Sequence, residues 1–106
     1  MDALVQQLCT AEHDITASRI GSVDELRGSL GRGYLLLEFE GTRGGTELGV
    51  RLDDEAVNHA ANDLDREAAV VRLTGGLRLN QVDVRCVAEL NVETMRGTGR
   101  LTVVEP

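Results

Sequence analysis

The amino-acid sequence predicts an α+β domain: a curved antiparallel sheet of about five strands, partly closed toward a barrel, with two or three short helices on one face. Several stretches alternate apolar and polar residues with period two, which is typical of strands that bury one face. Short glycine turns join these stretches, so consecutive strands should run antiparallel. Other stretches carry apolar stripes at helical spacing. A chain of 106 residues is expected to form a single domain, residues 1–106.

The longest alternating stretch, residues 77–92, is expected to be the central strand of the sheet. From Val82 onward every even position to 92 is apolar, whereas the apolar phase of residues 77–79 is opposite. A β-bulge or a tight bend near Asn80 and Gln81 would absorb this one-residue offset. A tight turn at residues 74–76 is expected to lead into the strand, and the offset favours strong curvature.

The N-terminal third of the chain predicts two helices and a short strand. An apolar stripe in the first ten residues indicates an amphipathic helix. Residues 14–20 are rich in β-branched side chains, which favours a short edge strand, with a continuation of the first helix as the alternative. Ser22 and Glu25 have the spacing of a capping box, so a two-turn helix with Val23 facing inward should follow and end at Gly31 or Gly33.

The remaining elements follow from the same patterns. Residues 34–40 and 46–52 should form a hairpin around the glycine loop between them. Asp53 is expected to cap a helix whose alanine-rich stripe allows close packing on the sheet. Residues 69–73, with Ala69 inward, and residues 99–105 complete the set of strands.

Composition restricts the function classes. The chain has 18 acidic and 11 basic residues and a net charge of −7, so it should repel a phosphate backbone, and no nucleic-acid partner is expected. Tyr34 and Phe39 are the only aromatic residues, which argues against a base-stacking platform and requires an aliphatic core. All basic residues are arginine, a feature explained by base composition of the gene or by arginine pairing at an interface.

Cysteine usage and hydropathy indicate a cytoplasmic protein. The sequence contains neither a charged-then-apolar leader nor an apolar run of about 18 residues, so no membrane association is expected. Cys9 and Cys86 occupy apolar positions of their elements and are expected to be buried, reduced thiols, with a disulfide between them as the less favoured alternative.

Motifs for catalysis, metals and cofactors are absent from the sequence. It has no Gly-x-Ser-x-Gly elbow, no His-Glu-x-x-His and no lysine for a phosphate loop. His13 and His59, with the two cysteines, lack the paired spacing of a zinc site. We therefore expect no catalytic residue, no metal and no cofactor, and enzymatic activity is less favoured than its absence.

Outward positions of the strands supply the candidate contact residues. Arginines alternate there with carboxylates, an arrangement typical of solvated cross-strand pairs or of a surface that meets a partner or an anionic ligand. A valine adds apolar surface, and one histidine falls off the apolar stripe of its helix. The candidate contacts for a ligand or partner are Arg51, Arg72, Arg85, Val87 and His59.

The leading functional hypothesis is a small acidic protein-interaction module without chemistry of its own, acting as a homodimer or as an accessory subunit of an assembly. It rests on a complete fold signature without a chemical motif. The second hypothesis is a small-ligand carrier or small enzyme whose curved sheet forms a cup, with Arg72 or Arg85 binding an anionic group. The third is an inhibitor or immunity-type protein that covers a basic site with its acidic surface.

Overall fold

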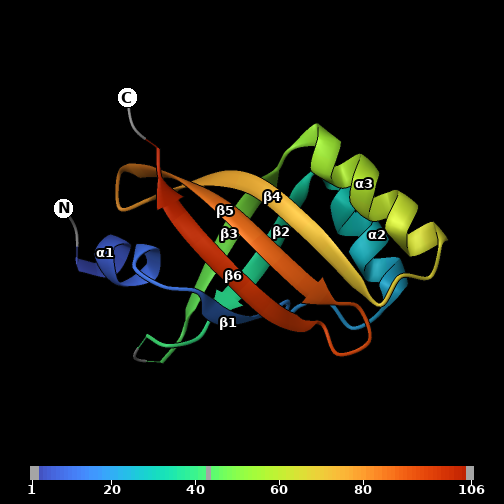
Figure 1. Cartoon of the computed structure of the whole chain (residues 1–106), viewed down its shortest axis with the longest axis horizontal. Helices are drawn as coiled ribbons and strands as arrows, with labels where there is room; N and C mark the ends of the chain where they lie inside the picture. The colour runs from blue at the N-terminus through green and yellow to red at the C-terminus, as the bar shows by residue number, and fades with distance from the viewer. Residues whose placement is uncertain (1–2, 43, 105–106) are drawn as a thin grey trace.

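The computed structural model describes residues 3–42 and 44–104 and shows a closed antiparallel barrel of six strands with three helices packed against it (Figure 1). Strand neighbours follow chain order, and β6 returns to pair with β1. The elements are α1 (Ala3–Cys9), β1 (His13–Thr16), α2 (Val23–Arg32), β2 (Tyr34–Phe39), β3 (Thr46–Leu52), α3 (Asp54–Asp65), β4 (Val70–Leu79), β5 (Val82–Asn91) and β6 (Arg96–Val103).

The α+β class and the closure of the curved sheet are confirmed, with six strands where about five were expected. Helices α2 and α3 lie together at one end of the barrel, and α1 lies at the other end beside β6 (Figure 1). A strand is present where residues 14–20 favoured one, but β1 covers only His13–Thr16, and it is not the expected edge strand, because it closes the barrel by pairing with both β2 and β6.

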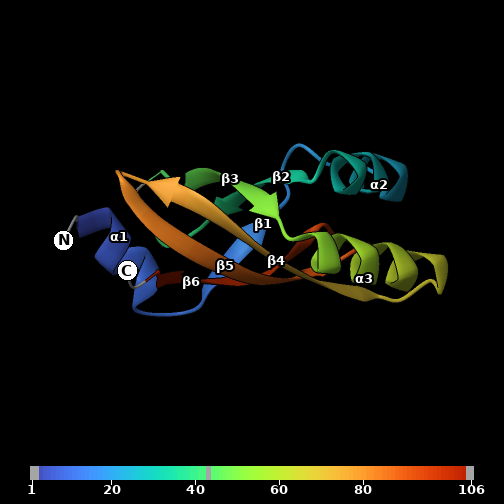
Figure 2. The same cartoon turned by 90° about the horizontal axis from the view of Figure 1, so that it is seen from above.

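The barrel consists of two unequal parts. Strands β4, β5 and β6 are joined by ladders of ten and eight pairs, and β6 holds β1 by four. The β2–β3 hairpin has six internal pairs but only two with β1 and two with β4. Seen from above, the hairpin lies on one side and β4, β5 and β6 on the other (Figure 2). We call these parts the hairpin and the long sheet.

The expected single strand over residues 77–92 is wrong. Asn80 and Gln81 have φ values of 48° and 69°, and they form a two-residue turn between β4 and β5. Two successive left-handed residues are the geometry of a type I′ turn, whose twist matches that of the flanking strands. The change of apolar phase near residue 80 therefore marks the point where the chain turns back on itself. Of the two expected explanations, the tight bend is closer to this turn than the β-bulge is.

The turn expected at residues 74–76 is also wrong, because these residues lie inside β4. A β-carbon on Gly75 would stand 2.3 Å from the carbonyl oxygen of Arg51 in β3. The glycine is thus required for the close approach of two backbones and not for a turn.

The expected helices are present, and the capping signals of α2 are confirmed. The Ser22 hydroxyl accepts a hydrogen bond of 3.2 Å from the Glu25 amide, and Gly33, at φ 70°, ends α2. Val23 was expected inward but is 37% exposed, because it is the first residue of the helix. Ala69 is exposed for the equivalent reason, since it precedes β4. The last strand starts at Arg96, three residues before the expected start.

The interior of the barrel is filled by aliphatic side chains around one ring, that of Phe39. The expected inward faces of β2 and β3 are buried, and Val5 and Leu8 of α1 join the same cluster. Such filling is usual in small barrels. Among residues 3–42 and 44–104, no helix combines the length and apolar composition needed to cross a membrane.

Candidate functional site: a cleft between strands β3 and β4

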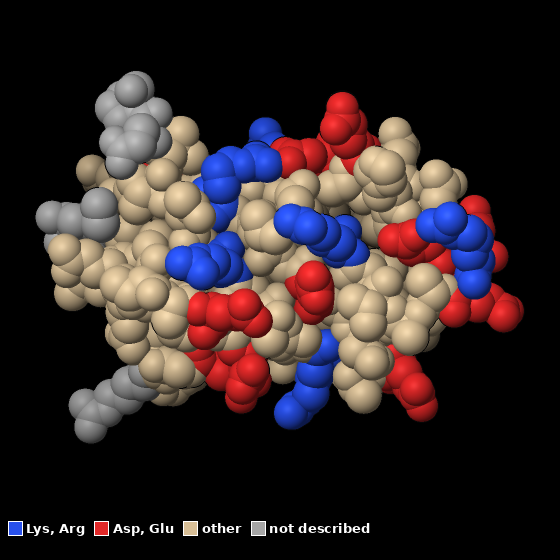
Figure 3. Space-filling model, in the orientation of Figure 1, with Lys and Arg blue, Asp and Glu red and all other residues tan. Residues whose placement is uncertain are grey.

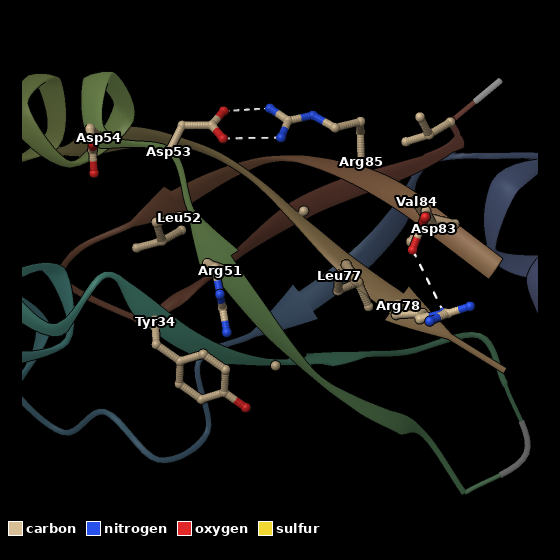
Figure 4. Close-up of a pocket in the computed structure, with 13 residues that line it drawn as sticks. Tyr34, Arg51, Leu52, Asp53, Asp54, Leu77, Arg78, Asp83, Val84 and Arg85 are labelled. Carbon is tan, nitrogen blue, oxygen red and sulfur yellow. Dashed lines mark hydrogen bonds and ion pairs between the residues drawn. The ribbon is translucent and has the colours of Figure 1, made fainter. Parts of the chain in front are cut away.

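A surface cleft with a volume of about 750 Å³ lies where β3 and β4 diverge (Figure 4). Its walls come from β3, the start of α3, β4 and β5, with Tyr34 of β2 at one side. The lining residues are Tyr34, Gly49, Arg51, Leu52, Asp53, Asp54, Gly76, Leu77, Arg78, Asp83, Val84, Arg85 and Val104. We call it the β3–β4 cleft.

The cleft exists because the β3–β4 ladder stops after two pairs, Arg51 with Gly76 and Leu52 with Gly75. Successive residues of an antiparallel strand direct their backbone groups to opposite neighbours. Since the Leu52 amide donates to Gly33 on the β2 side, Gly49 and Arg51 direct theirs toward β4. Arg51 pairs with Gly76, whereas Gly49 lies beyond the end of the β3–β4 ladder.

The same alternation applies to β4. The carbonyl of Thr74 accepts from the Asp53 amide, so Thr74, Gly76 and Arg78 direct their backbone groups toward β3. Arg78 has no partner residue in the β3–β4 ladder. The β3–β4 cleft is therefore bordered by two facing strand edges whose hydrogen-bonding groups are available to an added strand.

Asp53 ties the closed end of the cleft together. Its carboxylate accepts 2.9 Å from the Thr74 hydroxyl and 3.0 Å from Arg85 Nη1, and Arg85 Nη2 donates to its second oxygen. The hydrogen bond from Arg85 holds the pKa of Asp53 below its ordinary value, although partial burial opposes this. Asp53 occupies the N-cap position of α3 as expected, but its side chain makes no capping hydrogen bond. The expected side-chain cap is therefore wrong. The carboxylate joins β3 to β4 and β5 instead.

Arg51 is the cation of the cleft that is left without a carboxylate. Its guanidinium forms no ion pair or hydrogen bond with the part of the chain that the structure describes. Figure 4 shows it projecting from β3 into the space between Tyr34 and Leu77. Arg78 is only loosely tied to Asp83, at 3.8 Å between two well-exposed side chains. Such a pair contributes little energy and is readily exchanged.

Tyr34 supplies the aromatic surface of the site. A β-carbon on Gly49 would stand 1.8 Å from the Tyr34 hydroxyl, so the tyrosine lies across the glycine on the neighbouring strand. An aromatic residue diagonal to a strand glycine fills the space that the missing side chain leaves. Tyr34 nevertheless remains 47% exposed. It also lines a second cleft of about 410 Å³, beside Arg32 of α2.

The sequence-derived contact residues are dispersed over the molecule. Arg51 and Arg85 meet in the β3–β4 cleft, but Arg85 is occupied by Asp53. Val87 lines a separate cleft of about 310 Å³ on β5 and β6, and Arg72 lies opposite Glu89 on β4. His59 is exposed on α3. On the face made by β4, β5 and β6, basic and acidic side chains are interspersed (Figure 3).

Three cleft residues were not singled out from the sequence: Tyr34, Gly49 and Arg78. The outward phase of Tyr34 in its strand was a usable signal, because a large aromatic facing solvent is unusual in a chain with two aromatic residues. No pattern indicated Gly49 or Arg78, since their importance comes from the end of a ladder between strands distant in the chain.

His13 holds α1 to the barrel. Its ring nitrogens lie 3.1 Å from the carbonyl oxygen of Glu40 and 3.2 Å from that of Gln7, and its ring meets Phe39 edge-on. Both acceptors are main-chain carbonyls, so this histidine connects a helix to the end of β2. Within residues 3–42 and 44–104, His, Cys, Asp and Glu form no group of three able to hold a metal ion.

Comparison with known proteins adds no relative. No protein-family model matches the chain, and no curated protein matches it in sequence.

Proposed function

We propose that this protein is a small protein-interaction module, acting as a homodimer or as an accessory subunit of a larger assembly, and that the β3–β4 cleft receives an extended segment of the partner as an added strand. The observation that carries the proposal is the early end of the β3–β4 ladder after two pairs. Strand addition of this kind uses main-chain hydrogen bonds for affinity and flanking side chains for specificity.

The surroundings of the cleft support a protein partner. Exposed Tyr34 and unpaired Arg51 are residue types that often dominate binding energy at interfaces. Partly buried Leu77 adds apolar area on the side of Arg51 that faces away from Tyr34 (Figure 4). The cleft is open at the surface, which suits a chain segment better than a small molecule that must be surrounded.

A small anionic ligand is the second candidate, favoured by the uncompensated guanidinium of Arg51. We expect it to bind in the same cleft, beside Arg51, and not inside the barrel, because the interior is filled by aliphatic side chains. The cup anticipated from the curved sheet is then replaced by an external site.

A proline substitution on β4 tests the strand-addition proposal. Arg78 directs its amide toward β3, away from β5, so Arg78→Pro removes a donor that no ladder uses and blocks pairing along this edge. Arg78→Gln removes the same charge and keeps the amide, and it is the matched control.

The measurement is native mass spectrometry of protein purified gently from its own source. We expect the wild type and Arg78→Gln to retain a second copy or another protein chain in fixed ratio, and Arg78→Pro to lose it. Equal retention by both variants would overturn strand addition. A monomer that carries a defined small mass would favour the ligand candidate, and a bare monomer would overturn both.

A further inference from the structure

We infer that the β3–β4 cleft selects an extended segment that carries a carboxylate side chain at the position facing Gly49. This inference rests on the proposed function and adds the chemistry of the partner. It follows from the side chains that surround the part of the β3 edge beyond the two-pair ladder.

The position facing Gly49 is spacious on the outer side of the sheet. An added residue paired with Gly49 would point its side chain to the same face as that of its partner. Gly49 has no side chain there, and the atoms nearest to the place of its missing β-carbon belong to Tyr34. The incoming side chain therefore packs against this ring instead of clashing with a cross-strand neighbour.

The position facing Gly49 lies near two guanidiniums and one carboxylate that is already compensated: Glu47, the outward residue of β3 on the other side of Gly49, is paired with Arg19. Arg51 is the next outward residue of β3, and its guanidinium has no partner among the described residues. Arg78 stands on the facing edge of β4 with its loose contact to Asp83. A carboxylate between two guanidiniums gains charge-assisted hydrogen bonds, whereas an ammonium there would be repelled.

The carboxylates of the cleft lie at its two ends and leave this position uncompensated. Asp54 is at the start of α3 and Asp83 is beside Arg78, on opposite sides of Arg51 (Figure 4). Asp53 is already neutralised by Arg85. The preference is thus for an acidic residue at one position, although the whole chain has a net charge of −7.

Three capped peptides test the inference: Thr-Val-Thr-Glu-Thr-Val-Thr and the same peptide with Gln or Lys at the centre. Binding is followed by shifts of the backbone amide resonances of the isotope-labelled protein. We expect the Glu peptide to move the amides of Gly49 and Arg78 and to bind about five-fold more tightly than the Gln peptide. The Lys peptide should bind most weakly, and salt should reduce the differences.

Arg51→Gln should remove the preference for Glu over Gln, while Arg72→Gln, outside the cleft on the same sheet, should leave it unchanged. If the Glu and Gln peptides bind equally at the cleft, the acidic selection is overturned and the proposed function stands. If no peptide moves the amides of Gly49 and Arg78, both are overturned. If Arg72→Gln acts like Arg51→Gln, the preference comes from overall charge and the assignment to Arg51 is wrong.

Discussion

The hairpin and the long sheet show how one barrel combines a well-paired part with an accessible one. In the long sheet, β5 is paired with β4 over all ten of its residues and with β6 over eight of them. In the hairpin, β2 and β3 are well paired with each other, but each outer edge has only two pairs. Local stability follows such differences, and binding surfaces are drawn from the less stable regions. The hairpin accordingly supplies one of the two strand edges that border the β3–β4 cleft, and β4 of the long sheet supplies the other.

Side chains replace the missing ladder in holding the hairpin. Arg19 makes a two-pronged pair with Glu47, with nitrogen–oxygen distances of 3.1 and 3.2 Å, and Asp53 connects the end of β3 to Thr74 and Arg85. The inward side of the hairpin, including Phe39, is buried in the common core. The hairpin is therefore fixed by packing and by a few polar contacts, which allows its edge to remain free.

Thiol labelling should show the largest difference between the two parts. Cys86 in β5 and Val50 in β3 are each 1% exposed, and burial raises the pKa of the Cys86 thiol to about 12. In Cys9→Ser protein we expect Cys86 to react only on opening of the long sheet. In protein that lacks both native cysteines, we expect the thiol of Val50→Cys to react about 100-fold faster than that of Cys86. This ratio corresponds to a difference of about 3 kcal/mol between the free energies of opening of the two parts. Equal rates would show that the barrel opens as one unit.

Adjacent glycines of β4 provide the next test. Gly75→Ala places a methyl group against the carbonyl oxygen of Arg51, which cannot move without breaking the two-pair ladder, and should cost about 2 kcal/mol of unfolding free energy. At Gly76 the nearest atom to an added β-carbon is 3.6 Å away, so Gly76→Ala should change stability by less than about 0.5 kcal/mol. Urea unfolding measures both, and similar losses would contradict the close-approach argument.

Asp53→Asn should cost about 1 kcal/mol at neutral pH, because it weakens a partly exposed ion pair and a hydrogen bond. The folded-state pKa of Asp53 lies below its unfolded value of about 3.9. Its contribution is therefore complete above about pH 4 and is lost as the pH falls through the folded pKa. Urea unfolding at neutral pH and at about pH 3 should show the difference from wild type shrinking. Asp54→Asn is the control, and an equal, pH-dependent loss there would contradict the role of Asp53.

The smallest effect is expected at the turn of the long sheet. Gln81 holds φ 69°, a left-handed conformation that glycine adopts without steric cost. Gln81→Gly creates the preferred Asn-Gly pair of a type I′ turn and should stabilise the protein by about 0.5 kcal/mol, seen as a higher melting temperature. Gln81→Ala keeps the β-carbon and should give no gain. A loss in the glycine variant would show that the turn is not limited by backbone strain.

Prediction of the turns failed where glycine is an unreliable guide. Gly75 and Gly76 suggested a turn, but Gly75 instead permits the close approach of the β3 and β4 backbones. The actual turn is formed by Asn80 and Gln81 and contains no glycine. For the site, Arg51 and Arg85 were found from their outward phase. Their outward positions could not show that Arg85 is paired with Asp53, because that residue is 32 positions away in the chain.

The features that could be derived from the sequence are local: the period of the strands, the Ser22 cap, the end of α2 at one of two glycines and the aliphatic core. These follow from neighbours within a few residues, where hydrogen bonding and side-chain direction leave few choices. Only the tertiary structure decided the closure by β1, the two-pair limit between β3 and β4, and the free guanidinium of Arg51. Each depends on which distant segments meet, and a sheet can close around the same inward faces with a longer or a shorter ladder.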